Sequence, residues 1–147
     1  MLSKSQHKHL SNCRPFHLAL AVPNLEKTRE FYVKTLGCSL GRTAETWIDL
    51  NFFGHQLSFH QSTEYQSSKV TNSVDAKQVP IPHLGVILTM EQWRGLAEDL
   101  KEKKIEFIIE PYIRFEGQKG EQATMFIPDP NGYHLEFKAF ADDQSIF

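Results

Sequence analysis

Five side chains that can bind a metal ion or carry a proton lie near the ends of strand-like segments: His17, His60, His83, His134 and Glu136. Two neutral imidazoles and one carboxylate that converge form the facial ligand set favoured by divalent first-row metals such as Fe(II), and they leave coordination positions open. A single histidine on a strand is more often a surface residue or a hydrogen-bonded residue. The argument for a metal site therefore depends on the pattern around these side chains.

The sequence around the histidines repeats. Residues 16–22 (FHLALAV) and 82–88 (PHLGVIL) are both typical of strands and carry a histidine in second place. Residues 54–60 (GHQLSFH) and 132–138 (GYHLEFK) share Gly, Leu and Phe at matched positions. Two repeats in the same order indicate a duplicated module.

A helix is predicted after each opening strand. Asn24 is a suitable N-cap for a helix over 25–36, which Gly37 would end. Thr89 with Gln92 three positions later is typical of a capping box at the start of a helix over 90–103. Further strands are predicted at 47–53, 56–61, 105–112, 122–127 and 133–140.

The order βαβββ thus occurs twice, which predicts an α+β fold in which two modules form a curled mixed sheet around a metal site. We expect a single domain over 15–141, made of modules at about 15–61 and 80–141 that the polar linker 62–79 joins, with a flexible tail over 1–14 and a C-terminal tail over 142–147. The linker is long enough to overhang a site.

Alternation along the strands places the candidate ligands on one side of the sheet. Phe16, Leu18, Leu20 and Val22 form an apolar face that suits packing under a helix. Since the helices need the apolar faces, the opposite faces should line a concave surface that carries all five candidates. His17 and His83 hold equivalent positions in the repeat, and the small residues Ala19 and Gly85 leave room for a ligand beside them.

Other polar residues are weaker candidates. Substrate contact or support of the ligands is expected for the polar-face residues Asp49, Asn51, Ser58 and His134, although a solvated strand face explains them about as well. Arg114 and Lys119 could bind an anionic group of a substrate, and a solvated loop is the simpler explanation.

Composition excludes several classes of protein. The 147 residues carry a net charge of −2 at a pI near 6.4, which gives no electrostatic footprint for nucleic acid. No apolar run is long enough to cross a bilayer, and residues 1–11 lack the apolar stretch of a secretory signal. Cys13 and Cys38 have no CxxC spacing, so inert thiols in a reducing cytoplasm are expected.

Two motifs resemble a known family. The opening HLALAVPNLEKTREFYVKTLG and the closing FIPDPNGYHLEFK resemble the vicinal oxygen chelate superfamily, which includes glyoxalase I, extradiol dioxygenases and bleomycin-resistance proteins. The similarity covers about residues 15–141. The segments WIDLNFFGHQLSFH, VPIPHLGV and EFIIEPYIRFEGQKGEQATMF are most similar to a subgroup of predicted extradiol-type dioxygenases. This resemblance implies a metal site at His17, His83 and Glu136.

The resemblance also bears on the reaction. Glyoxalase I enzymes use four protein ligands, and the fourth position here is Ser58, a poor ligand. Extradiol dioxygenases carry an acid–base histidine on the fourth strand, and His60 looks like that residue. The tyrosine usual in those enzymes is absent from 124–126, so its role is unfilled or has moved to Tyr133 or Tyr112.

The expected function is therefore Fe(II)-dependent oxygenation of a small substrate with adjacent oxygen donors, by a cytoplasmic homodimer that binds neither nucleic acid nor membrane. Two alternatives stay open. One is a glyoxalase-type lyase or isomerase with Ni or Zn, and Mn is a further possible metal. The other is a non-catalytic resistance protein that binds a small molecule.

Overall fold

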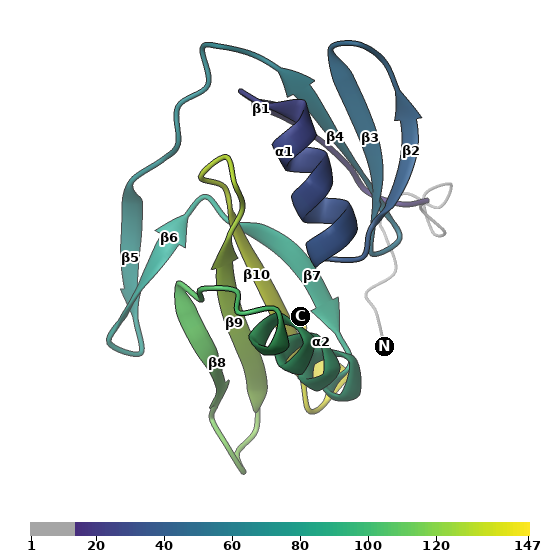
Figure 1. Ribbon diagram of the computed structural model, residues 1–147. Coiled ribbons are helices and arrows are strands. Elements are labelled where there is room, and N and C mark those ends of the chain that lie inside the picture. Colours follow the sequence, from purple (N-terminus) through teal and green to yellow (C-terminus); the bar gives the residue numbers. More distant parts are fainter. Residues whose placement is uncertain (1–13) are drawn as a thin grey trace, which may run out of the picture.

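Two βαβββ modules follow one another along the chain in the computed structural model, which describes residues 14–147 (Figure 1). Residues 1–13 of the expected tail, and Cys13 with them, lie outside the described residues. The first module comprises β1 (His17–Val22), α1 (Leu25–Glu30), a π-helical turn η2 (Phe31–Thr35), β2 (Ser39–Thr43), β3 (Trp47–Phe52) and β4 (His55–Gln61). The second comprises β7 (Leu84–Leu88), α2 (Met90–Glu102), β8 (Ile109–Arg114), β9 (Gln122–Pro128) and β10 (His134–Phe140). The predicted α+β fold of paired modules is confirmed.

Each module has its own four-stranded mixed sheet. The strand orders are β1-β4-β3-β2 and β7-β10-β9-β8. The opening strand pairs in parallel with the closing strand in both sheets, and the other pairs are antiparallel. This equivalence of topology supports the duplication seen in the sequence.

Local signals set the helix ends as expected. The side chain of Asn24 accepts a hydrogen bond from the backbone N–H of Lys27 at 2.9 Å. Thr89 and Gln92 exchange the two hydrogen bonds of a capping box. The helix expected over 25–36 is divided into α1 and the wider turn η2, and Gly37 follows it with a φ of +73°.

Two segments differ from the sequence-based expectation. The linker contains a hairpin of β5 (Val70–Val74) and β6 (Lys77–Ile81), which form a separate two-stranded sheet. The strand expected over 105–112 begins only at Ile109, because Ile105 and Phe107 pack against the core from an irregular segment. A 3₁₀ turn, η3 (Asp143–Ser145), follows the last strand.

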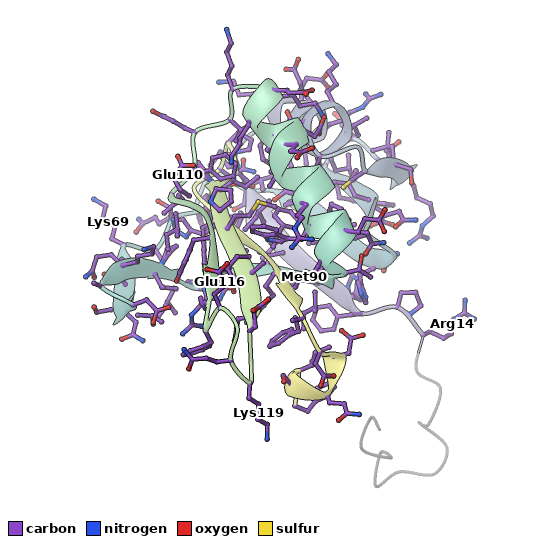
Figure 2. All side chains as sticks on the ribbon, turned by 90° about the horizontal axis from the view of Figure 1, so that it is seen from below. Arg14, Lys69, Met90, Glu110, Glu116 and Lys119 are labelled. Carbon is purple, nitrogen blue, oxygen red and sulfur yellow. The ribbon has the colours of Figure 1, made fainter. Side chains whose placement is uncertain are left out.

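The two modules share one hydrophobic core. α1 packs on β3 and β4, and α2 packs on β7, β9 and β10. The rings of Phe52 in β3 and Phe137 in β10 lie 6.3 Å apart, and Lys103 donates to the backbone carbonyl of Thr35 at 2.8 Å. Figure 2 shows α2 lying over this packed interior. Because the helix-covered faces of both sheets meet in this core, the opposite faces of the sheets point outward.

A buried polar cluster ties α1 to the turn before β10. The Asp129 carboxylate accepts hydrogen bonds from the hydroxyl of Tyr32 at 3.1 Å, from the side chain of Asn131 at 2.9 Å, and from the backbone N–H groups of Asn131 and Tyr133, both at 2.8 Å. Thr28 in α1 contacts the Asn131 amide from the other side. The turn over residues 129–132 (DPNG) is therefore a contact between modules.

No helix in residues 14–147 combines the length and the hydropathy that crossing a bilayer would need.

Candidate metal centre

His83 and Glu136 meet on the outward face of the second sheet. Their Nε2 and Oε2 atoms lie 3.0 Å apart, and the two side chains are 32% and 15% exposed. Glu136 pairs with Gly85 across the parallel strands β10 and β7. A Cβ atom at residue 85 would collide with the backbone carbonyl of Glu136, so only glycine permits this close approach.

Neighbouring groups orient both side chains. The Nδ1 of His83 lies 2.8 Å from the backbone carbonyl of Pro80, and a carbonyl can only accept, so Nδ1 carries the proton in the neutral ring. The lone pair of Nε2 then faces Glu136. The Thr124 hydroxyl donates to Oε1 of Glu136 at 2.8 Å, which leaves Oε2 directed at His83. Support of this kind is usual for histidine and carboxylate ligands of metals.

The charges of the pair favour the ionised carboxylate. When the ring is protonated, Nε2 donates to the Glu136 carboxylate, and this hydrogen bond is the largest influence on His83 and raises the pKa of its imidazole. Burial alone would raise the pKa of Glu136, but the hydrogen bonds from His83 and Thr124 outweigh it, and the pKa is lowered. Lys138 Nζ lies 4.0 Å from Oε1 and adds to this effect.

These donors fit a divalent metal ion. An ion bonded to each donor at about 2.1 Å in octahedral geometry keeps neighbouring ligand atoms roughly 3 Å apart. The 3.0 Å between Nε2 of His83 and Oε2 of Glu136 matches that separation. The pair could therefore hold an ion without moving apart, but it supplies only two protein ligands.

His17 is not beside this pair within one chain. It lies on β1, is exposed, and pairs with Gln56 of β4. Across residues 14–147, no three His, Cys, Asp or Glu side chains gather closely enough to hold a metal. The convergence expected from the sequence is not met inside one chain, because the shared core turns the outer faces of the two sheets away from each other.

His60 lies on the same face of the first sheet as His17, but further along it. Its register partners are Ala21 on β1 and Trp47 on β3. His17 pairs with Gln56, four residues before His60, which corresponds to about 13 Å along the strand. His60 is therefore too far along the sheet to bind the same ion as His17.

Ser58, at the position equivalent to Glu136, is committed to another contact. Its hydroxyl donates to Oδ1 of Asp49 at 2.5 Å, and Arg42 donates to Oδ2 at 3.2 Å. The Asp49 side chain is only 9% exposed. A cavity of about 310 Å³ opens beside it and is also lined by Arg42, Asn51, His55 and Gln56. Asp49 thus lines this cavity, and Ser58 holds the Asp49 carboxylate in place.

Several of the remaining candidates have structural contacts. Asn51 accepts from the backbone of Gly54 at 2.7 Å and holds the turn between β3 and β4. His134 lies two residues before Glu136, with its Nδ1 3.4 Å from the carbonyl of Pro82. Lys119 lies in the exposed loop between β8 and β9 (Figure 2).

Two tyrosines and one arginine also have partners. Tyr133 donates to the carbonyl of Ala21 at 2.8 Å and joins the modules. Tyr112 and Arg114 both donate to Asp75 in the hairpin turn. Sequence reasoning did not identify Thr124 or Asp75. A polar residue in an otherwise apolar strand was the available signal for Thr124, whereas Asp75 sits in a polar segment without a pattern.

Cys38, the free thiol in the described part of the chain, is buried, and burial raises its pKa to about 11. It is therefore protonated near neutral pH and unreactive.

The family assignment follows from a family model that matches residues 14–137. The chain belongs to the Glyoxalase/Bleomycin resistance protein/Dioxygenase superfamily. No protein of curated function matches the chain.

Solved structures agree with this assignment. A glyoxalase/bleomycin resistance protein/dioxygenase from Alicyclobacillus acidocaldarius is 32% identical, with a TM-score of 0.74 over 90% of this chain and 96% of that chain. The fosfomycin resistance protein FosX from Listeria monocytogenes is 15% identical, with a TM-score of 0.66 over 89% of this chain and 95% of that chain. Virulence protein STM3117 from Salmonella typhimurium is 22% identical, with a TM-score of 0.61 over 88% and 98%. The last two likenesses concern the fold alone.

Proposed function

We propose that the chain is a metal-dependent enzyme whose ion is held by His83, Glu136 and His17. The observation that carries the proposal is the oriented pair of His83 and Glu136, whose Nε2 and Oε2 atoms lie 3.0 Å apart. The carbonyl of Pro80 and the hydroxyl of Thr124 hold the two donors in place.

The third ligand would come from a second copy of the chain. His17 lies on an outward sheet face in one module, and His83 and Glu136 lie on an outward face in the other. A symmetric dimer that lays the first face of each copy over the second face of the other copy would build two equal sites. The protein is then a homodimer in which neither copy is complete alone.

The proposed reaction is extradiol-type oxygenation with Fe(II), on a small substrate with adjacent oxygen donors. Bound at this site, the ion would supply chelation of those two oxygens. The residues of the chain have separate tasks. Asp49 and Arg42 would bind polar groups of the substrate in the 310 Å³ cavity, and His60 would move a proton on the part of the substrate furthest from the ion. Ser58 supports the choice of three protein ligands, because its hydroxyl is bonded to Asp49.

Glu136→Gln should lower metal affinity at least 10–100-fold, because losing a ligand should cost no less than losing a group that supports one. Isothermal titration with Fe(II) or Zn(II) and metal analysis of the purified protein measure the loss. Glu110→Gln is the matched control, since Glu110 is an exposed carboxylate on β8 of the same sheet (Figure 2). Equal metal content in both variants would remove Glu136 from the site.

His60→Ala should leave metal affinity within about twofold and lower turnover roughly 10²–10⁴-fold, the range that a general acid–base group contributes. The expectation rests on the separation of about 13 Å along the strand between His60 and Gln56, the register partner of His17. Oxygen uptake with a panel of catechols, and metal titration of the same samples, measure the two quantities. Loss of the metal from His60→Ala would contradict the three-ligand site and favour a glyoxalase-type isomerase with Ni or Zn.

A further inference from the structure

The outward face of the second sheet carries a cationic site, formed by Arg114 and Tyr112, that a carboxylate of the same chain occupies. Asp75, in the turn of the β5–β6 hairpin, accepts from Arg114 Nε at 2.6 Å and from the Tyr112 hydroxyl at 3.1 Å. Lys77 Nζ lies 4.3 Å from the centre of the Tyr112 ring. Figure 1 shows the hairpin beside β8 and β9.

Neighbouring groups on the sheet orient the two side chains of this cationic site. Arg114 is 22% exposed, and its guanidinium carbon lies 5.0 Å from the centre of the Phe115 ring. Tyr112 and Arg114 project from the outward face, because Ile113 between them packs against the core. An oriented guanidinium and a phenolic hydroxyl aimed at one point form a recognition site for a carboxylate.

The hairpin that carries Asp75 has few attachments to the rest of the molecule. Its strands pair only with each other, and most of β5 is exposed, with Val70 at 60%. A lone two-stranded hairpin has marginal stability in water. Among the described residues, Ser68 in the adjoining segment bonds the two ends of the hairpin, at Val70 and Ile81. Beyond that segment, side-chain hydrogen bonds join the hairpin to the rest of the molecule at Asp75 and at the carbonyl of Pro80.

We propose that Arg114 and Tyr112 form a binding site for a small carboxylate, and that the β5–β6 hairpin is a lid whose Asp75 occupies the site until such a ligand displaces it. The displaced hairpin turns about its base near Pro80. Arg114 also holds the pKa of Asp75 below its ordinary value, so the lid carries a charged carboxylate near neutral pH.

The carboxylate site lies on the same face of the second sheet as the candidate metal centre. Tyr112 pairs with Thr124 on β9, and Thr124 pairs with Lys138 on β10. Thr124 also bonds Glu136. Two strand spacings separate β8 from β10, on the order of 10 Å. If the metal site proposed above is correct, its substrate carries a carboxylate at about this distance from the chelating oxygens.

The test uses acetate as the probe and needs no metal, so its result is independent of the proposed metal site. Asp75→Asn keeps the shape of the turn and removes the charge that competes for Arg114. We expect acetate to bind this variant with a lower Kd than wild type, because the tethered carboxylate that competes for Arg114 is gone. Shifts of the Arg114 Nε resonance in NMR titrations report binding.

Two variants complete the comparison. Asp75→Asn combined with Arg114→Gln should lose the binding. Asp99→Asn removes another surface carboxylate, on α2, that forms an ion pair with Lys103, and this variant should behave as wild type. Equal acetate affinity in Asp75→Asn and wild type, or binding that survives loss of Arg114, would overturn the proposal.

Hydrogen exchange in the wild-type chain gives a measurement that needs no variant. Acetate that displaces Asp75 should speed exchange of backbone amides in residues 70–79, while exchange in β9 stays constant. If exchange in residues 70–79 does not change at saturating acetate, the proposal that the hairpin is a lid is overturned.

Discussion

A mixture of His17→Ala and Glu136→Gln chains should regain about a quarter of the wild-type metal content, although each variant alone should have lost its metal. Random pairing makes about half of the dimers mixed. One site of each mixed dimer takes His17 from the Glu136→Gln chain and the intact pair of His83 and Glu136 from the His17→Ala chain. The other site of that dimer lacks both.

Co-expression of the two variants with different tags and metal analysis of all the dimers together measure this recovery. Mixed dimers purified through both tags should hold about half of the wild-type metal content, because one of their two sites is intact. A mixture of Glu136→Gln chains and His83→Ala chains is the matched control. Both changes fall in the second module, so no pairing of these chains restores a site. Failure of the first mixture to recover, when each variant alone is metal-free, would mean that the site forms within one chain. An unchanged metal content in His17→Ala would mean that His17 is not a ligand.

Local sequence rules predicted most of the fold. The caps at Asn24 and Thr89 depend on side chains reaching backbone groups three residues away, so the sequence states them directly. Strand alternation likewise placed His83 and Glu136 on one face, since both lie on a pair of parallel strands in one module.

Alternation could not predict where His17 lies relative to that pair. It specifies which side chains share a face of a sheet, but not how two sheets pack. The structure joins the helix-covered faces of both modules in one core, through contacts such as that of Phe52 with Phe137. No short-range pattern distinguishes this arrangement from one in which the two sheets close around a single site.

The hairpin was missed for a different reason. Its turn places Asp75 and Ala76 at positive φ without a glycine, so the usual sequence signal of a two-residue hairpin turn is absent. Its strands carry Thr71, Asn72 and Ser73, which are typical of a loop. Pairing with β6 and the contact of Asp75 with β8 stabilise what the local sequence does not favour.

Asp129→Ala should lower the free energy of unfolding by roughly 3–5 kcal/mol. The carboxylate is 5% exposed and accepts from Tyr32, Asn131 and Tyr133. Its removal leaves these buried donors unpaired, at about 1–3 kcal/mol for each that water cannot reach. Urea denaturation followed by circular dichroism measures the change. Asp143→Ala, at an exposed carboxylate near the C-terminus, should stay within about 0.5 kcal/mol of wild type.

The pH dependence of the stability lost in Asp129→Ala tests whether burial or hydrogen bonding has the larger effect on the pKa of Asp129. Burial is the largest influence on the group and raises its pKa, although the hydrogen bonds from Asn131, Tyr133 and Tyr32 lower it in part. A carboxyl group with a higher pKa in the folded chain binds more protons there than in the unfolded chain. Its stability contribution is therefore complete below the unfolded pKa of about 3.9 and declines as pH rises through the folded value. The stability lost in Asp129→Ala should thus be larger near pH 4 than at pH 7. A loss that grows with pH would show that the hydrogen bonds hold the charged carboxylate more strongly than burial opposes it.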